Sequence, residues 1–330
     1  MSEAAYAQAE GLLEGKPKTS RSKPKDLNFT RARVARVVRR SPEVMVKITG
    51  NAKGGGHLKS HLEYITRKGK LDAEDERGAI ISGREDVAEV AQEWTQDSGK
   101  RKSNTRDSTN IVLSMPAMTD PEAVRAAARE FAKDTFAHNY QYLFVLHKDV
   151  DHPHVHLTIK NLGYDGTRLH VKKGDPQIWR EAFAEKLRQQ GVEAEATARA
   201  PRGVVRKPIC QAILALRRRG KRPEVDEAKV RAALKELTEG AKEGRGWEEK
   251  IKTRQTEVRR SWLVIAKELA KSPEPTDQAL STEVLNFVKT MPPLKTERHE
   301  IQEKLASQLR RGQTTSPRQV KNDQDPEQAR

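Results

Sequence analysis

Two short apolar segments joined by a six-residue connection restrict the fold of this chain more than any other feature. The segments are QYLFVLH (141–147) and HVHLTIKN (154–161), and KDVDHP connects them. Both segments are rich in aromatic and β-branched residues, which favours strands, and the Asp and Pro residues between them favour a turn. We therefore predict an antiparallel β-hairpin over residues 141–161.

The hairpin carries four of the nine histidines of the chain. Successive side chains of a strand point to opposite faces, so His154 and His156 share one face while Val155 points into a core. His147 ends the preceding strand, where the hairpin brings it over that pair. Three imidazoles held by a rigid sheet predict a divalent-metal site with open coordination positions, as in catalytic rather than structural sites.

Two further residues of the connection are candidates for this site. Asp149 has three open roles: it orients His147, ligates the metal, or acts as a base. His152 lies where Pro153 interrupts the strand, so we expect it to support a ligand or face DNA rather than to bind the metal. A histidine-rich surface hairpin without a metal is the alternative interpretation.

A tyrosine upstream is the candidate nucleophile. HLKSHLEYITRKG (57–69) predicts a helix that ends near Gly69, with Tyr64 close to its C-terminal end. Nearby cations favour a phenolate and also hold a phosphodiester; they are Arg67, Lys68 and Lys70. The earlier His57 and His61 share a helix face, but the glutamate of an H-E-x-x-H motif is absent, so we expect ordinary solvated side chains there.

Composition favours a polyanionic partner. The chain of 330 residues has 63 Lys and Arg against 47 Asp and Glu, a formal net charge of +16. A basic excess of this size favours nucleic acid first and an anionic membrane second. The only cysteine, Cys210, excludes disulfides within the chain, and neither a signal peptide nor a bilayer-spanning apolar run is visible. We expect a cytoplasmic protein without membrane insertion.

The chain divides into three predicted regions. Residues 1–40 are expected to form a basic, disordered arm, because residues 16–40 contain ten Lys and Arg with little to bury. Residues 41–208 alternate strands with amphipathic helices around the hairpin, which indicates an α+β domain with a central, mainly antiparallel sheet flanked by helices. Residues 209–330 are expected to be an all-α, charged accessory region with two apolar stripes (Val258, Trp262, Ile265, Leu269; Ile301, Leu305, Leu309).

Three segments in this order resemble the motifs of conjugative and mobilisation relaxases: HLEYITRKGKL, NIVLSMPA and HKDVDHPHVHLTIK. The resemblance is to the MOBP class of HUH endonucleases, which includes the agrobacterial T-DNA border endonuclease, and it covers roughly residues 44–208. It implies an HUH-type fold with Tyr64 as nucleophile, His147, His154 and His156 as metal ligands and Asp149 as their acidic helper. It places Ser114 near the nick site. Members of the class often carry Asn where this chain has Lys160, for which we expect a phosphate contact.

The implied function is a site- and strand-specific DNA relaxase. It nicks the origin of transfer by metal-assisted transesterification, remains linked to the 5′ end, and pilots and recloses the strand in conjugation or mobilisation. The implied metal is Mg²⁺ or Mn²⁺, with Zn²⁺ as a further candidate because imidazoles suit it. The implied partners are single-stranded origin DNA, relaxosome accessory proteins, a coupling protein and a type IV secretion system, with translocation of the protein alongside the strand.

Two alternatives stay open. Rolling-circle initiators and transposases of the HUH class usually place the tyrosine after the histidine pair, whereas Tyr64 precedes it, so the order favours the relaxase. The other alternative is a non-catalytic basic DNA-binding protein whose hairpin holds a structural metal.

Overall fold

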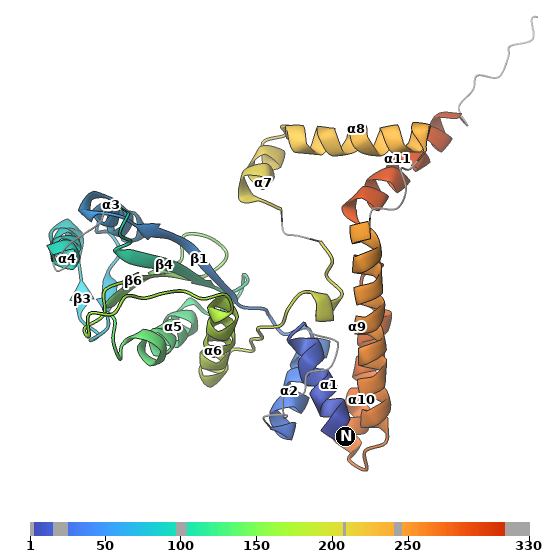
Figure 1. The fold of residues 1–330 in the computed structure, drawn as a ribbon, viewed down its shortest axis with the longest axis horizontal. Coiled ribbons are helices and arrows are strands. Elements are labelled where there is room, and N and C mark those ends of the chain that lie inside the picture. Colours follow the sequence, from blue (N-terminus) through green and yellow to red (C-terminus); the bar gives the residue numbers. More distant parts are fainter. Residues whose placement is uncertain (1–2, 16–25, 97–103, 207–208, 241–245, 314–330) are drawn as a thin grey trace, which may run out of the picture.

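A six-stranded antiparallel sheet forms the centre of one unit of the molecule, and helices form a second unit (Figure 1). The computed structural model describes residues 3–15, 26–96, 104–206, 209–240 and 246–313. The strand order is β1-β4-β6-β5-β2-β3, and every paired neighbour is antiparallel, as predicted. The strands are β1 (Met45–Ala52), β2 (Ala73–Asp75), β3 (Ile80–Ile81), β4 (Ser108–Ser114), β5 (Tyr142–His147) and β6 (His154–Lys160).

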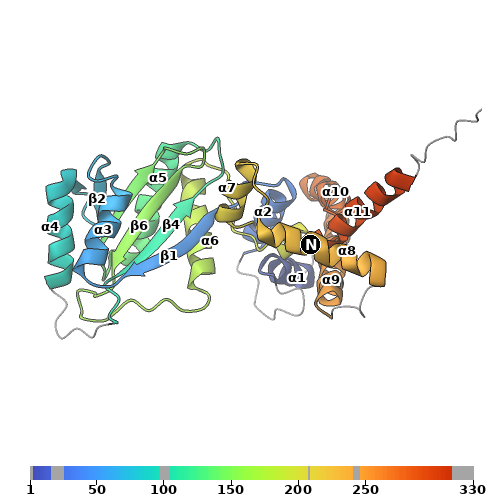
Figure 2. The same cartoon turned by 90° about the horizontal axis from the view of Figure 1, so that it is seen from above.

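Helices cover both faces of the sheet, which makes three layers (Figures 1 and 2). On one face, Leu58 and Leu62 pack with Leu143 and Val145 of β5. On the other face, aromatic side chains such as Phe131 pack against β4, β5 and β6. The covering helices are α3 (Gly55–Ile65) and α4 (Gly83–Gln96) on the first face, and α5 (Pro121–Phe136) and α6 (Asp175–Gln189) on the second.

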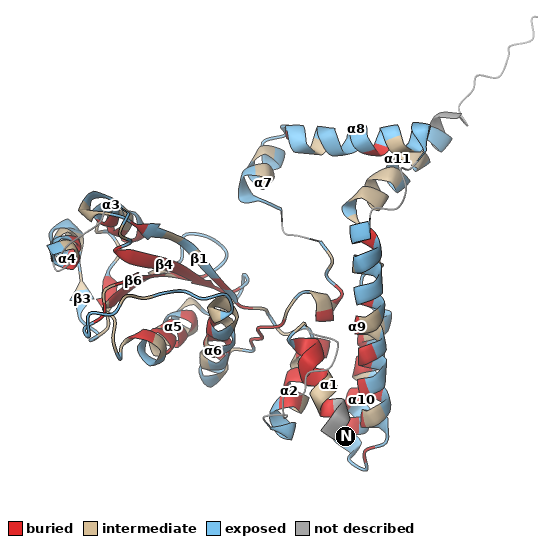
Figure 3. Cartoon of the chain, viewed as in Figure 1, coloured by how far each residue is buried: buried red, intermediate tan, exposed pale blue. Residues whose placement is uncertain are grey.

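Strand β6 lies in the middle of the sheet, between β4 and β5, and is largely buried (Figure 3). The β5–β6 hairpin is present as predicted, and its register pairs His147 with His154. Val155 faces the core of the second face, and the alternation of strand side chains therefore places the histidines on the face covered by α3. The sheet thus holds all three imidazoles at one end of its central strands.

The helical unit is formed by both ends of the chain. Its core contains Leu12 and Val34 from the N-terminal helices together with Trp262 and Val284 from the C-terminal ones. Trp262 is fully buried and its indole N–H donates to the Pro201 carbonyl at 2.8 Å. The elements are α1 (Glu3–Leu13), α2 (Leu27–Val38), the 3₁₀ turn η1 (Ala200–Arg202), α7 (Gln211–Arg218), α8 (Glu224–Glu239), α9 (Gly246–Ala270), α10 (Pro275–Lys289) and α11 (Glu297–Gln313).

The prediction of a disordered arm over residues 1–40 is wrong for residues 3–13 and 27–38, which are helices. Residues 16–25 of that arm lie outside the described residues. The many arginines of α2 favoured disorder, although the helix also has an apolar stripe of Val34, Val37 and Val38. This stripe is buried against α9 and α10. Short helices of this composition are not stable alone, so their formation depends on partners more than two hundred residues away.

The C-terminal region is helical, as predicted, but its two apolar stripes differ in burial. Val258, Trp262, Ile265 and Leu269 of α9 are buried in the helical core. The stripe on α11 is half-buried at Ile301 and exposed at Leu309. Within the described residues, no helix is both long enough and apolar enough to cross a bilayer.

Ion pairs connect the helical unit to the sheet. Glu195, which is buried, accepts from Arg33 at 3.3 Å and from Arg36 at 3.0 Å, both from α2. Its backbone pairs with Glu43, immediately before β1. Buried carboxylates of this kind need cationic partners, because an unpaired buried charge costs several kcal/mol. The junction therefore depends on α2 being folded.

The helical state of α2 can be tested with one buried and one exposed substitution. We expect Val34→Asp to lower the free energy of unfolding of the helical unit by about 3 kcal/mol, because it buries a carboxylate without a partner. Ala32→Asp, on the exposed side of the same helix, is the matched control. Chemical denaturation followed by tryptophan fluorescence measures both variants. Equal, small effects would show that α2 does not pack as a helix.

Candidate active site

Three imidazoles converge at one end of the central strands. The ring centroids lie 5.0 Å apart for His147 and His154, 4.4 Å for His147 and His156, and 5.2 Å for His154 and His156. One ring nitrogen of each histidine lies within 4.8 Å of the corresponding atoms of the other two. Two nitrogen ligands at about 2.1 Å from one ion are at most about 4 Å apart. Small rotations of the rings would therefore let them share a divalent metal.

Backbone carbonyls select which nitrogen each ring offers. Nε2 of His147 lies 2.6 Å from the carbonyl oxygen of Ile65, and a carbonyl only accepts, so Nε2 carries the proton and Nδ1 keeps a lone pair. Nδ1 of His154 lies 3.0 Å from the His152 carbonyl, which leaves Nε2 of His154 as the ligand atom. Partners of this kind are what orient metal-binding histidines in proteins.

Burial keeps two of the three imidazoles uncharged. Desolvation is the main cause that lowers the pKa of His156 to about 3, and the neighbouring His147 and His154 lower it further. Desolvation also lowers the pKa of His147, and the nearby guanidinium of Arg67 acts in the same direction. Neutral imidazoles are the form that binds metals, so His147 and His156 are in the ligating form at neutral pH.

Tyr64 lies beside this cluster at the C-terminal end of α3, as predicted. Its ring meets His156 edge-on, with 5.9 Å between centroids, and the residue is 57% exposed. The neighbouring face of α3 buries Leu58, Leu62 and Ile65, which fixes the helix on the sheet. The phenol is therefore both close to the three imidazoles and open to a substrate.

The turn after α3 is unusual in its backbone. Arg67 and Lys68 have φ angles of 52° and 61°, followed by Gly69 at 78°. A left-handed conformation costs a non-glycine residue roughly 1–2 kcal/mol. Gly69 also packs so closely that a Cβ there would lie 2.5 Å from the backbone carbon of Gly83. Such strain persists only where the surrounding structure enforces it, which is common at functional sites.

This turn directs Arg67 into the site. Its guanidinium forms an ion pair with Asp149, lies 3.3 Å from Nδ1 of His147, and stands 5.4 Å from the centroid of the Tyr64 ring. Arg67 thus bridges the tyrosine, a histidine and the aspartate, and its predicted DNA contact stays a prediction. Lys68 and Lys70 are exposed on the same turn and are available to a polyanion.

Asp149 is placed to hold Arg67 rather than to accept a proton. Its ion pair with the guanidinium is direct, and the hydrogen bond from Arg67 is the main cause that lowers the pKa of Asp149. One carboxylate oxygen lies 4.0 Å from Nδ1 of His147, which is beyond hydrogen-bond distance, and that nitrogen carries no proton. A carboxylate with a depressed pKa is a weak base, so the arrangement argues against the basic role, and the ligating role stays a prediction.

Ser114 and His152 also lie at this end of the sheet. Ser114 ends β4 and is the cross-strand neighbour of His154, so the two side chains share a face. The carbonyl of Pro153 accepts from the backbone N–H of Met115 at 3.1 Å, which ties the loop after β4 to the hairpin turn. The side chain of His152 is exposed, and its described contact to the cluster is through its carbonyl.

Lys160 is not brought to the histidines. It ends β6 four residues beyond His156, which is about 13 Å along a strand. Its ammonium donates to Gln141 at 2.8 Å, and the residue is 4% exposed. The following Asn161 is also buried and bonded to Thr109. Alternation placed Lys160 on the correct face, but distance along the strand separates it from the site.

His61 is the neighbour that the sequence interpretation missed. Its Nε2 lies 3.0 Å from the hydroxyl of Thr158 on β6, and burial lowers its pKa, whereas His57 is exposed as expected. The available signal was spacing: His61 precedes Tyr64 by three residues, so the two share a helix face. A helix face that presents Tyr64 to the sheet also presents His61.

Comparison with known proteins agrees with this geometry. Residues 64–192 match the relaxase family described as MobA/VirD2-like, nuclease domain. Those residues form a MobA/VirD2-like relaxase nuclease domain. The predicted resemblance, the fold class and an HUH-like histidine triad in this domain are thereby confirmed.

Curated relatives extend the match. The chain is 32% identical over 195 residues to the T-DNA border endonuclease VirD2 of Rhizobium radiobacter, which covers 52% of this chain and 45% of the relative. The VirD2 proteins of Rhizobium rhizogenes and Agrobacterium fabrum are 31% and 30% identical over the same length, with 44% and 43% of those proteins covered. The match therefore spans less than half the length of these relatives.

Loss of one imidazole should weaken metal binding and cleavage together. We expect His154→Ala to lower both Mn²⁺ affinity and nicking of an oligonucleotide by at least tenfold, because two ligands remain of three. Calorimetric titration with Mn²⁺ measures the first and a denaturing gel the second. His57→Ala, an exposed histidine on α3, is the matched control. Full cleavage in excess chelator would contradict the proposed role of a metal at this site.

The lowered pKa of His156 predicts a pH dependence of stability. Between about pH 6.5 and pH 3 the unfolded chain binds a proton that the folded protein excludes, so stability falls as the pH falls through this window. We expect His156→Gln to make this slope shallower by up to about 1 kcal/mol per pH unit, measured by chemical denaturation in chelator. His57→Gln should leave the slope unchanged, and an unchanged slope in both would contradict a buried neutral His156.

Proposed function

We propose that this protein nicks one strand of DNA by transesterification through Tyr64. The observation that carries the proposal is the convergence of an accessible phenol and three imidazoles within one relaxase nuclease domain. The phenolic oxygen attacks the scissile phosphorus and the P–O3′ bond breaks. The products are a 5′-phosphotyrosyl strand and a free 3′-hydroxyl, and reversal of the same step reseals the strand.

Each residue of the site has its own role in this reaction. His147, His154 and His156 would hold a divalent ion, which when bound supplies charge neutralisation and positioning of the scissile phosphate. Arg67 places a permanent positive charge beside the phenol. Asp149 holds that guanidinium in place. We propose that Ser114, Lys68 and Lys70 contact the strand around the nick.

The three imidazole nitrogens indicate which metal ions suit the site. Three imidazoles suit Mn²⁺ or Zn²⁺ better than Mg²⁺, which prefers oxygen ligands. A bound phosphodiester would supply oxygen ligands of the kind that Mg²⁺ prefers, so we propose Mn²⁺ or Mg²⁺ as the working ion, with Zn²⁺ as a further candidate. A structural site would instead be closed by a fourth protein ligand, and the described cluster contains three residues.

The biological setting is proposed from the relatives. The matched VirD2 proteins are T-DNA border endonucleases. We propose that this chain acts at an origin of transfer in plasmid conjugation or mobilisation, in the cytoplasm, and travels with the strand. Relaxosome accessory proteins, a coupling protein and a type IV secretion system are the proposed partners. A rolling-circle initiator or transposase remains the second candidate within the same chemistry.

A single substitution separates chemistry from binding. We expect Tyr64→Phe to abolish the covalent adduct, a loss of at least about a thousandfold in nicking, because the nucleophilic oxygen is gone. Affinity for the same single-stranded oligonucleotide should stay within about twofold of the parent protein. Tyr164→Phe, another exposed tyrosine, is the matched control. Adduct formation is read on a denaturing gel with labelled DNA and Mn²⁺; an adduct with the Tyr64→Phe protein would refute the assignment.

A further inference from the structure

An unusually basic segment follows the nuclease domain. Residues 196–223 contain nine Lys and Arg and no Asp or Glu, and five of the nine fall within residues 217–222. This short stretch, RRRGKR, forms the end of α7 and its turn into α8. We call residues 217–222 the basic turn.

Four cations of the basic turn lack an acidic partner among the residues that the structure describes. Arg217 is the exception, because its guanidinium forms two hydrogen bonds, 2.8 and 2.7 Å long, with Asp226. The remaining side chains are exposed and form no described ion pair: Arg218, Arg219, Lys221 and Arg222. Elsewhere in the segment, Arg202 pairs with Glu43 and Arg206 with Glu300. The unpaired charge is therefore concentrated in the turn.

Helix stability explains only part of this charge. Cations in the last turn of a helix interact favourably with its C-terminal carbonyls, which accounts for Arg218 and Arg219. Lys221 and Arg222 lie beyond the end of α7 and have no such role. Gly220 has a φ of 70°, and the backbone N–H of Lys221 donates to the Leu216 carbonyl at 3.0 Å. This closing turn fixes the backbone that carries the four cations.

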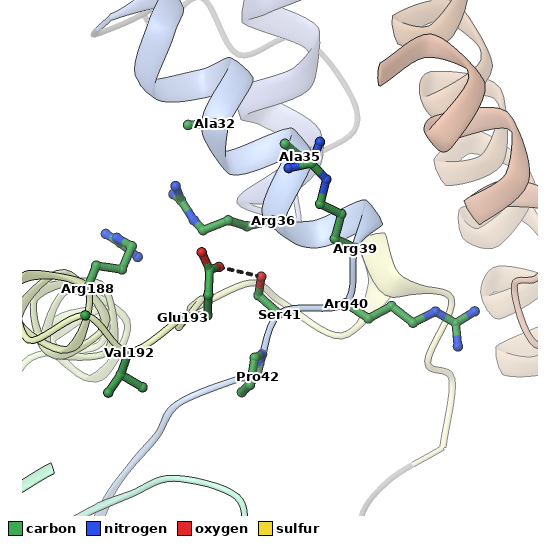
Figure 4. A pocket seen from close by; sticks show the side chains of 11 residues that line it. Ala32, Ala35, Arg36, Arg39, Arg40, Ser41, Pro42, Arg188, Val192 and Glu193 are labelled. Carbon is green, nitrogen blue, oxygen red and sulfur yellow. Dashed lines mark hydrogen bonds between the residues drawn. The ribbon is translucent and has the colours of Figure 1, made fainter. Parts of the chain in front are cut away.

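The arginine-lined pocket beside α2 provides a contrast (Figure 4). Three of its four guanidiniums are matched to carboxylates: Arg36 to Glu195, Arg39 to Glu283 and Arg188 to Glu185. The fourth, Arg40, donates to the hydroxyl of Thr290 at 3.0 Å. The arginines of that pocket therefore hold the fold together. The basic turn has no equivalent structural use.

The position of α7 connects the basic turn to the nuclease domain. Helices α3 and α7 lie on the same side of the sheet, opposite α5 and α6 (Figures 1 and 2). The histidines lie on this side as well. Lys47 of β1 is exposed on that face, because it lies opposite Val112 of β4, which in turn lies opposite His156 of β6. DNA that leaves the histidine cluster across β1 would thus move toward α7.

We propose that the basic turn is a second DNA-contact site that binds the phosphates of duplex DNA next to the nicked region. The inference rests on the proposed function, which makes DNA the polyanion that the protein binds. No Phe, Tyr or Trp occurs between Phe183 and Trp247, so the segment offers no aromatic ring on which unpaired bases stack. Contact through Lys and Arg alone fits the regularly charged duplex and reads no sequence.

The test is the salt dependence of binding. The full-length protein is titrated with a blunt duplex of arbitrary sequence at several NaCl concentrations. Each phosphate contact contributes about 0.9 to the slope of log affinity against log salt. A variant with Arg218, Arg219, Lys221 and Arg222 changed to Gln keeps the Arg217–Asp226 pair. We expect its slope to be shallower by about three to four than that of the parent protein.

A variant with the same loss of charge is the control. Lys250, Lys252, Lys267 and Lys289 are exposed on α9 and α10, and their change to Gln should alter the slope by less than about one. Equal effects of the two variants would overturn the proposal, since net charge alone would then explain binding. Preferential loss of binding to anionic phospholipid vesicles, with duplex binding intact, would also overturn it.

Adduct formation keeps this test separate from the proposed nicking activity. The quadruple variant should still form the tyrosyl adduct with a short single-stranded oligonucleotide and Mn²⁺, because the nuclease domain is unchanged. Loss of duplex affinity with adduct retained supports the basic turn. If both proteins form the adduct and the quadruple variant has the same salt slope as the parent protein, the basic turn is refuted and the nicking activity is not. If the variant has a shallower salt slope but the parent protein forms no adduct, the nicking activity is refuted and the basic turn is not.

Discussion

The pairing of His147 with His154 across the β5–β6 hairpin is the contact on which the candidate site depends. Because β6 is hydrogen-bonded on both sides, by β4 and β5, a shift of register would break two ladders at once. A shift of one residue would also turn every side chain of β6 to the opposite face. The same shift would expose Val155, Leu157 and Ile159, so the hydrophobic core itself enforces the position of the imidazoles.

A second constraint joins the tyrosine to this cluster. The strained turn after α3 carries Arg67 to the rim of the histidines, where it contacts Asp149 and His147 and stands beside Tyr64. The carbonyl of Ile65, the last residue of α3, bonds to His147 and ties the same helix to the metal side. The nucleophile and the ligands thus share one rigid framework.

The two ends of the chain meet in the helical unit. Helix α2 buries its valines against α9 and α10, and its arginines pair with Glu195 beside the sheet. The N-terminal helices therefore stand between the C-terminal helices and the nuclease domain. Helix α7 and its basic turn lie on the histidine side of the sheet (Figures 1 and 2).

The sequence by itself determined the hairpin, the alternation that points His154 and His156 away from the core, the helix that carries Tyr64, and the all-α C-terminal region. These follow from local periodicity and turn chemistry, which depend on neighbouring residues. The tertiary structure alone decided that residues 3–13 and 27–38 are helices, because their apolar stripes are stable only against α9 and α10. It also decided that Arg67 joins Asp149, that His61 meets Thr158, and that Lys160 lies away from the site. Those facts depend on distances between segments that are far apart in the chain, and no local pattern encodes such distances.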